Sequence, residues 1–193
     1  MGGSWECTNR LRKKRATRFV LSGRDDTDRQ AIKGNAELPI TDAVAALLQT
    51  WNRNYYRYHK FDVAHFAEIQ TVIEEHPEVI SDLRQRSIES LTAADEDTIV
   101  SIFTDFEEVL GPVGAAKCLH LLAPEFFPLW DRAIAEAYGV YLGIRGKNGK
   151  KYYHFMEITT DQVQRLRKER KRIKHLVKAI DEFNYCRYTL GIL

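Results

Sequence analysis

The sequence lacks the features that mark membrane proteins and secreted proteins. It contains no run of about 18 apolar residues, which a membrane-spanning helix needs. It does not open with a charged and then apolar signal segment. Its three cysteines, Cys7, Cys118 and Cys186, are odd in number and far apart, which fits a reducing compartment and gives no disulfide framework. We therefore expect a soluble cytoplasmic protein that has no membrane partner.

Motifs for common cofactors and nucleophiles are also missing. The sequence has no glycine-rich nucleotide loop and no Gly-x-Ser-x-Gly elbow. Its six histidines show no spacing with cysteine or acidic residues that would enclose zinc. The sequence therefore predicts neither a metal site nor a cofactor.

What the sequence does have is an uneven distribution of charge behind a formal net charge of +2. Residues 1–61 hold 12 basic and 6 acidic residues, residues 62–108 hold 2 and 13, and residues 109–193 hold 15 and 8. Basic surfaces bind nucleic acid because each neutralised phosphate releases counterions. The two basic flanks are candidates for such a surface, and the acidic middle is not.

Apolar spacing and capping residues predict a nearly all-α protein of six to eight helices. Residues 1–35 are expected to form a basic, weakly ordered segment, either a solvated tail or an arm that binds phosphates. Residues 36–193 are expected to form one helical domain. In it, Asp62 caps a helix, and Pro77 begins another as its first residue.

The last third of the chain is predicted to contain a loop and a long helix. Residues 143–153 are expected to form the loop, with a tight turn at residues 148–149. Thr160 or Asp161 then caps the helix, whose apolar residues continue to Ile180.

The segment 97–123 is the most distinctive part of the sequence. Apolar residues at helical spacing predict a helix over 97–110, and residues 115–122 favour a second one. Between them stands Gly111-Pro112-Val113-Gly114. Proline has no amide hydrogen and glycine permits unusual backbone angles, so we expect a tight hairpin. The second helix would open at Gly114 with free amides that can bind a phosphate, although such a turn can also be a plain connector.

Residues 110–134 resemble the motif of the helix-hairpin-helix DNA glycosylase superfamily. The similarity consists of Leu-x-x-Val-Gly between two helices, then Asp131 seventeen residues after Gly114, then x-x-Ile. The family's usual order is Leu-Pro-Gly-Val-Gly, whereas here the proline and the first glycine are exchanged. The resemblance is specific over residues 98–138 and weaker over residues 40–188.

This resemblance implies an endonuclease III-like fold, with two small helical lobes and a cleft between them. Some members of the family carry a four-cysteine iron–sulfur cluster after the last helix. Only Cys186 lies in that region, so we expect no cluster here. The segment 97–123 would be the hairpin, and residues 124–131 would form the loop that carries the catalytic aspartate.

The resemblance also implies roles for individual residues. Asp131 would be the catalytic carboxylate, and its position before a helix equally suits an N-cap. Family members that also cut the DNA backbone use a lysine two residues after the last glycine of the hairpin. That position is Ala116 here, and Lys117 is rotated from it by about 100°. We therefore expect the amine of Lys117 to point away from the sugar and to contact a phosphate or solvent. The residues expected to bind DNA are Gly111, Val113, Gly114, Ala115, Ala116, Lys117 and Arg132.

A glycosylase also needs aromatic or apolar surfaces against which an extruded base can stack. Trp51, Tyr55 and Tyr58 share one helical face, which suits either the core or such a surface. Tyr56 lies off this face, and His120 lies one helical turn from Lys117. The candidates for a base pocket are Trp51, Tyr55, Tyr56, His120 and Trp130.

The sequence therefore leads us to expect a monomeric DNA glycosylase of base excision repair. It would flip a damaged or mismatched base out of double-stranded DNA and hydrolyse the bond between that base and its sugar, without cutting the backbone. In a prokaryote it would be nucleoid-associated. The alternative is a non-catalytic helix-hairpin-helix DNA-binding protein, and a third possibility is an all-α interaction module. A pure binder has no need for a carboxylate beside the DNA backbone.

Overall fold

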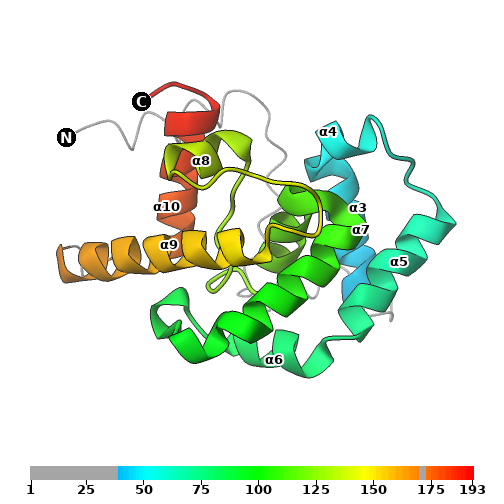
Figure 1. Ribbon diagram of the computed structural model, residues 1–193, viewed down its shortest axis with the longest axis horizontal. Coiled ribbons are helices and arrows are strands. Elements are labelled where there is room, and N and C mark those ends of the chain that lie inside the picture. The colour runs from blue at the N-terminus through cyan, green and yellow to red at the C-terminus, as the bar shows by residue number, and fades with distance from the viewer. Residues whose placement is uncertain (1–38, 170–172) are drawn as a thin grey trace, which may run out of the picture.

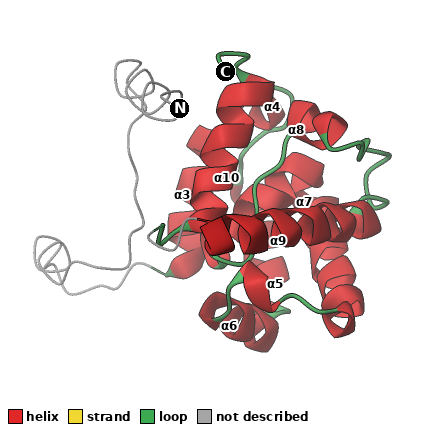
Figure 2. Cartoon of the chain, turned by 90° about the vertical axis from the view of Figure 1, so that its left-hand side faces the viewer, coloured by secondary structure: helices red, strands yellow, loops and turns green. Residues whose placement is uncertain are grey.

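The computed structural model describes residues 39–169 and 173–193, so the basic segment 1–35 lies outside the described residues. The described part consists of helices joined by loops and contains no strand, which confirms the all-α prediction for these residues (Figure 2). The division into two lobes stays a prediction. The elements are α3 (Ile40–Trp51), α4 (Arg53–Tyr56), α5 (Val63–Glu74), α6 (Pro77–Gln85), η1 (Ile88–Ser90), η2 (Ala93–Asp95), α7 (Glu96–Leu122), α8 (Arg132–Ala137), α9 (Gly149–Glu169), α10 (Leu176–Asn184) and the π-helix η3 (Tyr185–Thr189).

Helix α7 is the central element, and α3, α5 and α9 pack against it (Figure 1). Its inward side chains meet an aromatic cluster, in which Phe103 stacks on Tyr152 with ring centroids 4.2 Å apart. The indole of Trp130 packs edge-on against both rings, at 5.7 Å from Phe103 and 4.9 Å from Tyr152. All three side chains are almost fully buried. Rings that meet edge-on or offset gain about 0.5–1.5 kcal/mol per pair beyond their area burial, so this cluster holds α7, α9 and the loop before α8 together.

The expected four-residue hairpin is a kink of one residue within α7. Only Gly111 leaves helical geometry, at φ 69° and ψ 169°, a region that glycine adopts at little cost. Pro112 begins the second helical segment, where a missing amide hydrogen costs nothing. Gly114 lies within the first turn of that segment and is buried. The prediction of a break was correct, but the break is three residues shorter than expected.

Side chains satisfy the backbone carbonyl groups around this kink. Buried carbonyls without a partner would each cost about 1–3 kcal/mol. The donors come from α4, from the loop between α8 and α9, and from the loop before α8. The contacts are Tyr55 Oη to Val109 O at 2.9 Å, Arg145 Nε to Glu107 O at 3.2 Å, Arg145 Nη2 to Glu108 O, and Trp130 Nε1 to Pro112 O at 3.0 Å.

Two predicted helix starts are confirmed, and the course of the first predicted helix is corrected. Asp62 caps α5 by accepting a hydrogen bond from the His65 amide, and Pro77 is the first residue of α6. In contrast, α3 ends at Trp51 and α4 begins at Arg53, so the three aromatic residues do not share one buried face. Trp51 is 40% exposed, and Tyr58 is 81% exposed.

The region after α8 also differs from the prediction. Residues 149–153, expected in a loop, form the first turns of α9, which runs without interruption through residues 160 and 161. The tight turn lies earlier, where the Lys147 amide donates to Ile144 O at 3.1 Å. Asn148 is buried instead of forming a turn, because its backbone amide and its side chain both donate to the buried carboxylate of Glu107.

Two further findings concern cysteines and membrane segments. Cys118 is a buried free thiol, whereas Cys186 is disulfide-bonded, which corrects the expectation of a chain without disulfides. Among the described helices, none is long and apolar enough to span a bilayer.

The buried position of Gly114 gives a first prediction. A Cβ atom there would lie 2.7 Å from Asn52 Nδ2 and 2.8 Å from Leu110 Cβ. We expect Gly114→Ala to lower the free energy of unfolding by about 1–3 kcal/mol, the usual cost of overpacking, as measured by urea denaturation. In an Asn52→Ala background the cost should be smaller, because one of the two clashes is gone. Equal costs in the two backgrounds would show that Asn52 does not limit the space at Gly114.

Candidate active site

Asp131 occupies the N-cap position of α8, as the sequence predicted. Its Oδ1 accepts a hydrogen bond from the Ile134 amide at 2.9 Å, and its Oδ2 accepts one from Thr189 Oγ1 at 2.6 Å. The residue is half-buried. Two hydrogen bonds from elements far apart in sequence therefore fix the orientation of a carboxylate that solvent still reaches. Thr189 was not singled out in the sequence, because only the packing of η3 against α8 brings it there.

Lys117 lies on the second segment of α7, and its amine faces the site. Nζ donates to the backbone oxygen of Trp51 at 3.0 Å and lies 5.6 Å from the centroid of that indole ring. Burial lowers the pKa of Lys117, and the carboxylate of Asp131 opposes this effect by raising the same pKa. The one-residue offset in the motif predicts an amine that points away from the sugar of a bound DNA, and this stays a prediction. In the structure the amine lies against Trp51.

His120 lies one helical turn further along α7, in edge-on contact with Trp51 at 6.2 Å between ring centroids. Its Nδ1 lies 2.8 Å from the backbone oxygen of Phe127 and 3.8 Å from Oδ2 of Asp181. Because the carbonyl oxygen of Phe127 can only accept, Nδ1 carries the proton and donates to it, and the neutral ring keeps a bare Nε2. Burial also lowers the pKa of His120, which favours this neutral form.

Asp181 is a site residue that sequence reasoning missed. It is buried on α10, its Oδ1 accepts a hydrogen bond from the Leu129 amide at 3.0 Å, and burial raises its pKa well above the usual range. Within the described residues its Oδ2 has no hydrogen-bond partner. A signal was available, since Asp181 follows Ile180 and lies four residues after Val177, both on the apolar face of α10.

The predicted DNA-binding residues separate into covered and accessible ones. The structure buries Gly111, Gly114, Ala115 and Ala116. The ring of Tyr55 lies 3.5 Å from the position of a Cβ on Gly111, and Asn52 covers Gly114. The accessible members of the predicted set are Val113 and Lys117, which are half-buried, and Arg132, which is exposed.

The base-pocket candidates also lie in different surroundings. Trp51 and His120 adjoin Lys117, as described above. Trp130 is only 1% exposed and belongs to the core. Tyr55 donates to Val109 O and stacks on the His59 ring at 4.0 Å, and the hydroxyl of Tyr56 pairs with His65. Only Trp51 and His120 are therefore included in the site proposed below.

Comparison of the chain with protein-family models, with curated proteins and with solved structures finds no match. The site must therefore be interpreted from its own chemistry. It combines a fixed carboxylate, a half-buried amine, a neutral imidazole and a partly exposed indole. In the part of the chain that the structure describes, no cluster of three or more His, Cys, Asp or Glu side chains could hold a metal ion. Two cavities, of about 260 and 370 Å³, lie elsewhere: the first between α6 and the start of α7, and the second beside the start of α9.

The opposing effects on Lys117 can be tested directly. Because the Asp131 carboxylate raises the pKa of Lys117, we expect Asp131→Asn to lower that pKa further, as followed by NMR titration of the Lys117 side chain. Glu136→Gln, which removes an exposed carboxylate from the same helix α8, should leave it unchanged. An identical titration in wild type and Asp131→Asn would mean that the two groups do not interact.

Proposed function

We propose that this protein is a DNA glycosylase that removes a damaged or mismatched base from double-stranded DNA, with Asp131 as its catalytic carboxylate. The observation that carries the proposal is the placement of Asp131. It is a half-buried carboxylate, fixed by Ile134 and Thr189, that interacts with the amine of Lys117. Its position after the kink in α7 has the spacing on which the family resemblance rests.

The proposed reaction breaks the bond between C1′ of the sugar and the base nitrogen, and the bonding electrons leave with the base. Positive charge develops on the sugar, and a carboxylate such as Asp131 stabilises it. A water molecule then bonds to C1′ and passes a proton to Asp131, which acts as general base. The departing base takes up a proton from solvent. Trp51 supplies the aromatic surface on which the extruded base would stack.

The proposal extends to the fold and the setting of the enzyme. We take the helices to form the two-lobed arrangement of helix-hairpin-helix glycosylases, working as a monomer in the compartment that holds the cell's DNA. The accessible contacts to the DNA backbone at the site would be Val113, Lys117 and Arg132.

A second candidate function, cleavage of the DNA backbone, is favoured by one observation. Burial lowers the pKa of Lys117, although the Asp131 carboxylate raises it, and a neutral amine is a nucleophile. Such an amine could bond to C1′ as the base leaves, and the resulting imine would permit elimination of the 3′ phosphate. Against this, the amine is held by the Trp51 carbonyl and lies over the Trp51 ring. We therefore keep water as the nucleophile.

The decisive experiment is a panel of labelled duplexes that each carry one damaged or mismatched base. Strand breaks after treatment with hot alkali reveal excised bases. Excision of at least one base supports the proposed glycosylase activity. Salt-dependent binding to the same duplexes without any excision would favour the non-catalytic DNA-binding alternative. Absence of both excision and binding would contradict the glycosylase and the DNA-binding protein alike.

The role of Asp131 gives a sharper prediction. We expect Asp131→Asn to reduce single-turnover excision by about 10²- to 10⁴-fold, the usual contribution of a general base. Folding should be retained, because asparagine caps helices as well as aspartate does. The hydroxyl of Thr189 can either donate or accept, so that contact also survives.

The matched control is Glu136→Gln on the same helix, which should excise at the wild-type rate. DNA affinity and thermal unfolding of both variants are measured in parallel, so that lost activity is not confused with lost structure. Wild-type excision by a folded Asp131→Asn protein would remove this residue from the mechanism.

The question of backbone cleavage is tested by trapping with borohydride, which reduces an imine between enzyme and sugar to a stable adduct. We expect no substantial adduct with the wild-type protein, and product strands should stay intact until they are heated in alkali. An adduct that forms with wild type and disappears in Lys117→Ala would establish the second candidate function instead.

A further inference from the structure

Two basic segments flank the kink in α7, and the proposed reaction does not use them. The first is residues 52–60, which include α4. This segment contains Arg53, Arg57 and Lys60 and no carboxylate. All three basic residues are exposed, and among the described residues neither arginine forms an ion pair. Tyr58 between them is 81% exposed.

The second segment is residues 141–151, between α8 and the first turn of α9. It holds Arg145, Lys147, Lys150 and Lys151 and no carboxylate. Two apolar side chains accompany these charges at the surface, with Tyr141 65% and Ile144 82% exposed.

This second segment has a defined position because it is fixed to α7 from the inside. The buried side chain of Asn148 donates to Glu107, and its oxygen accepts from the Gly143 amide at 2.6 Å. A cavity of about 370 Å³ lies beside the segment, lined by Gly139, Val140, Tyr141, Lys150, Lys151 and His154.

The two segments meet over the kink. The guanidinium of Arg145 lies beside the hydroxyl of Tyr55 on α4, and it donates to the carbonyls of Glu107 and Glu108 on α7. The ring of Tyr55 in turn covers Gly111. The first segment also reaches the candidate active site, because Trp51, which precedes it, accepts the hydrogen bond from Lys117.

We infer that residues 52–60 and 141–151 form one surface that binds the phosphate backbone of the duplex on one side of the damaged nucleotide. The inference rests on the proposed function, which supplies the premise that the bound molecule is duplex DNA with a damaged nucleotide. Arginine and lysine contacts to phosphates position a protein on DNA without reading its sequence. Exposed tyrosine and isoleucine side chains next to these charges suit contacts with sugars and bases. One carboxylate of the acidic range adjoins this surface, because Glu108 Oε2 lies 3.9 Å from Arg145 Nε.

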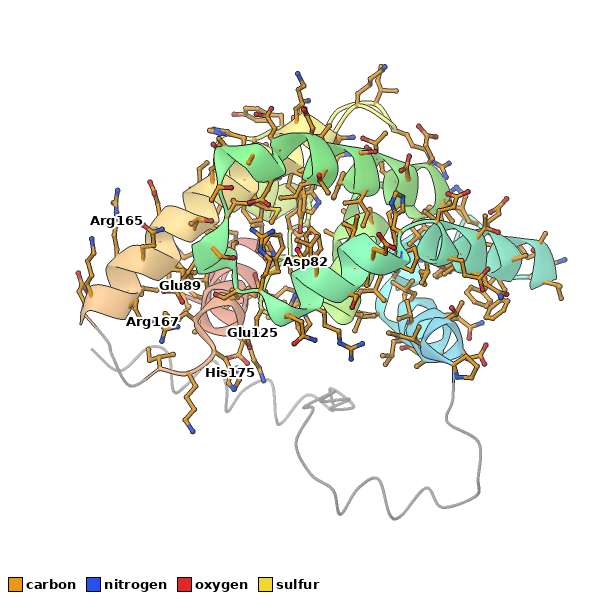
Figure 3. The ribbon with its side chains drawn as sticks, turned by 90° about the horizontal axis from the view of Figure 1, so that it is seen from below. Asp82, Glu89, Glu125, Arg165, Arg167 and His175 are labelled. Atoms are coloured by element: carbon orange, nitrogen blue, oxygen red, sulfur yellow. The ribbon has the colours of Figure 1, made fainter. Side chains whose placement is uncertain are left out.

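The test uses substitutions that spare structural contacts. Arg145 and Lys151 are left intact, because Arg145 donates to the Glu107 carbonyl before the kink in α7 and Lys151 donates to Tyr141 O at 2.8 Å. The test variant is Arg57→Ala with Lys147→Ala, one exposed residue from each segment. The matched control is Arg165→Ala with Lys168→Ala, two exposed residues near the other end of α9. Figure 3 labels Arg165 on this end of α9, and in Figure 1 this end of the helix lies on the opposite side of the view from α4.

Affinity for an undamaged labelled duplex is measured by fluorescence anisotropy at several salt concentrations. For wild type, log K falls linearly with log salt, by about 0.9 per phosphate contact. We expect the test variant to bind more weakly and to lose about two contacts from this slope. The control variant should match wild type. Equal slopes in all three proteins would overturn the inference.

A second measurement tests whether the surface contacts the duplex on only one side of the damaged base. Two duplexes carry the same damaged base near one end or near the other, so that only one side of the base continues as duplex. The test variant should lose affinity for one of these duplexes and not for the other. An equal loss for both would show that the surface does not follow one arm. Binding of wild type to vesicles of anionic phospholipid but not to DNA would assign the surface to a membrane and overturn the inference.

The two proposals fail in different ways. If the panel yields excised bases while test and control variants bind alike, the surface is wrong and the glycosylase stands. If no base is excised while the test variant alone loses its salt-dependent binding, the surface stands and the glycosylase is wrong.

Discussion

The structure depends on the satisfaction of backbone groups at a break in its central helix. Gly111 and Pro112 interrupt the hydrogen bonding of α7, because Pro112 has no amide hydrogen to donate to the preceding turn. Tyr55 and Arg145 donate to carbonyls before the break, and Trp130 donates to the Pro112 carbonyl after it, from three different parts of the chain. These donors fix α4, the loop before α9 and the loop before α8 around the break. The last of these loops ends at Asp131, so the same contacts position the candidate active site.

Features governed by local chemistry could be predicted from the sequence. The caps at Asp62 and Asp131 depend on a short polar side chain and the amide three residues later. The start of α6 at Pro77 depends only on the fixed φ of proline. The position of the break in α7 was predicted on the same grounds. Its extent was not, since Pro112 can be read as a helix breaker or as a first helical residue, and the structure uses it as the first residue of the second segment.

Features that depend on distant partners could not be predicted. Thr189 reaches the site only because η3 packs against α8. The sequence marks Asp181 as an acid on an apolar helix face, but not its contact with the Leu129 amide. The direction of the Lys117 side chain depends on an acceptor at Trp51, 66 residues away in the sequence. Trp130 stands next to Asp131 in the sequence, yet its side chain points into the core. A motif gives the residue types and their spacing, whereas the side-chain directions come from the rest of the fold.

The hydrogen bond from Trp130 to Pro112 has a consequence for the dynamics of the molecule. The indole hydrogen is enclosed by Phe103 and Tyr152 and is bound to a carbonyl of the second segment of α7. It can exchange with solvent deuterium only when the loop before α8 separates from that segment. The exchange rate of this single proton therefore measures the free energy of that opening. The motion involved is the one that would move Asp131 relative to Lys117.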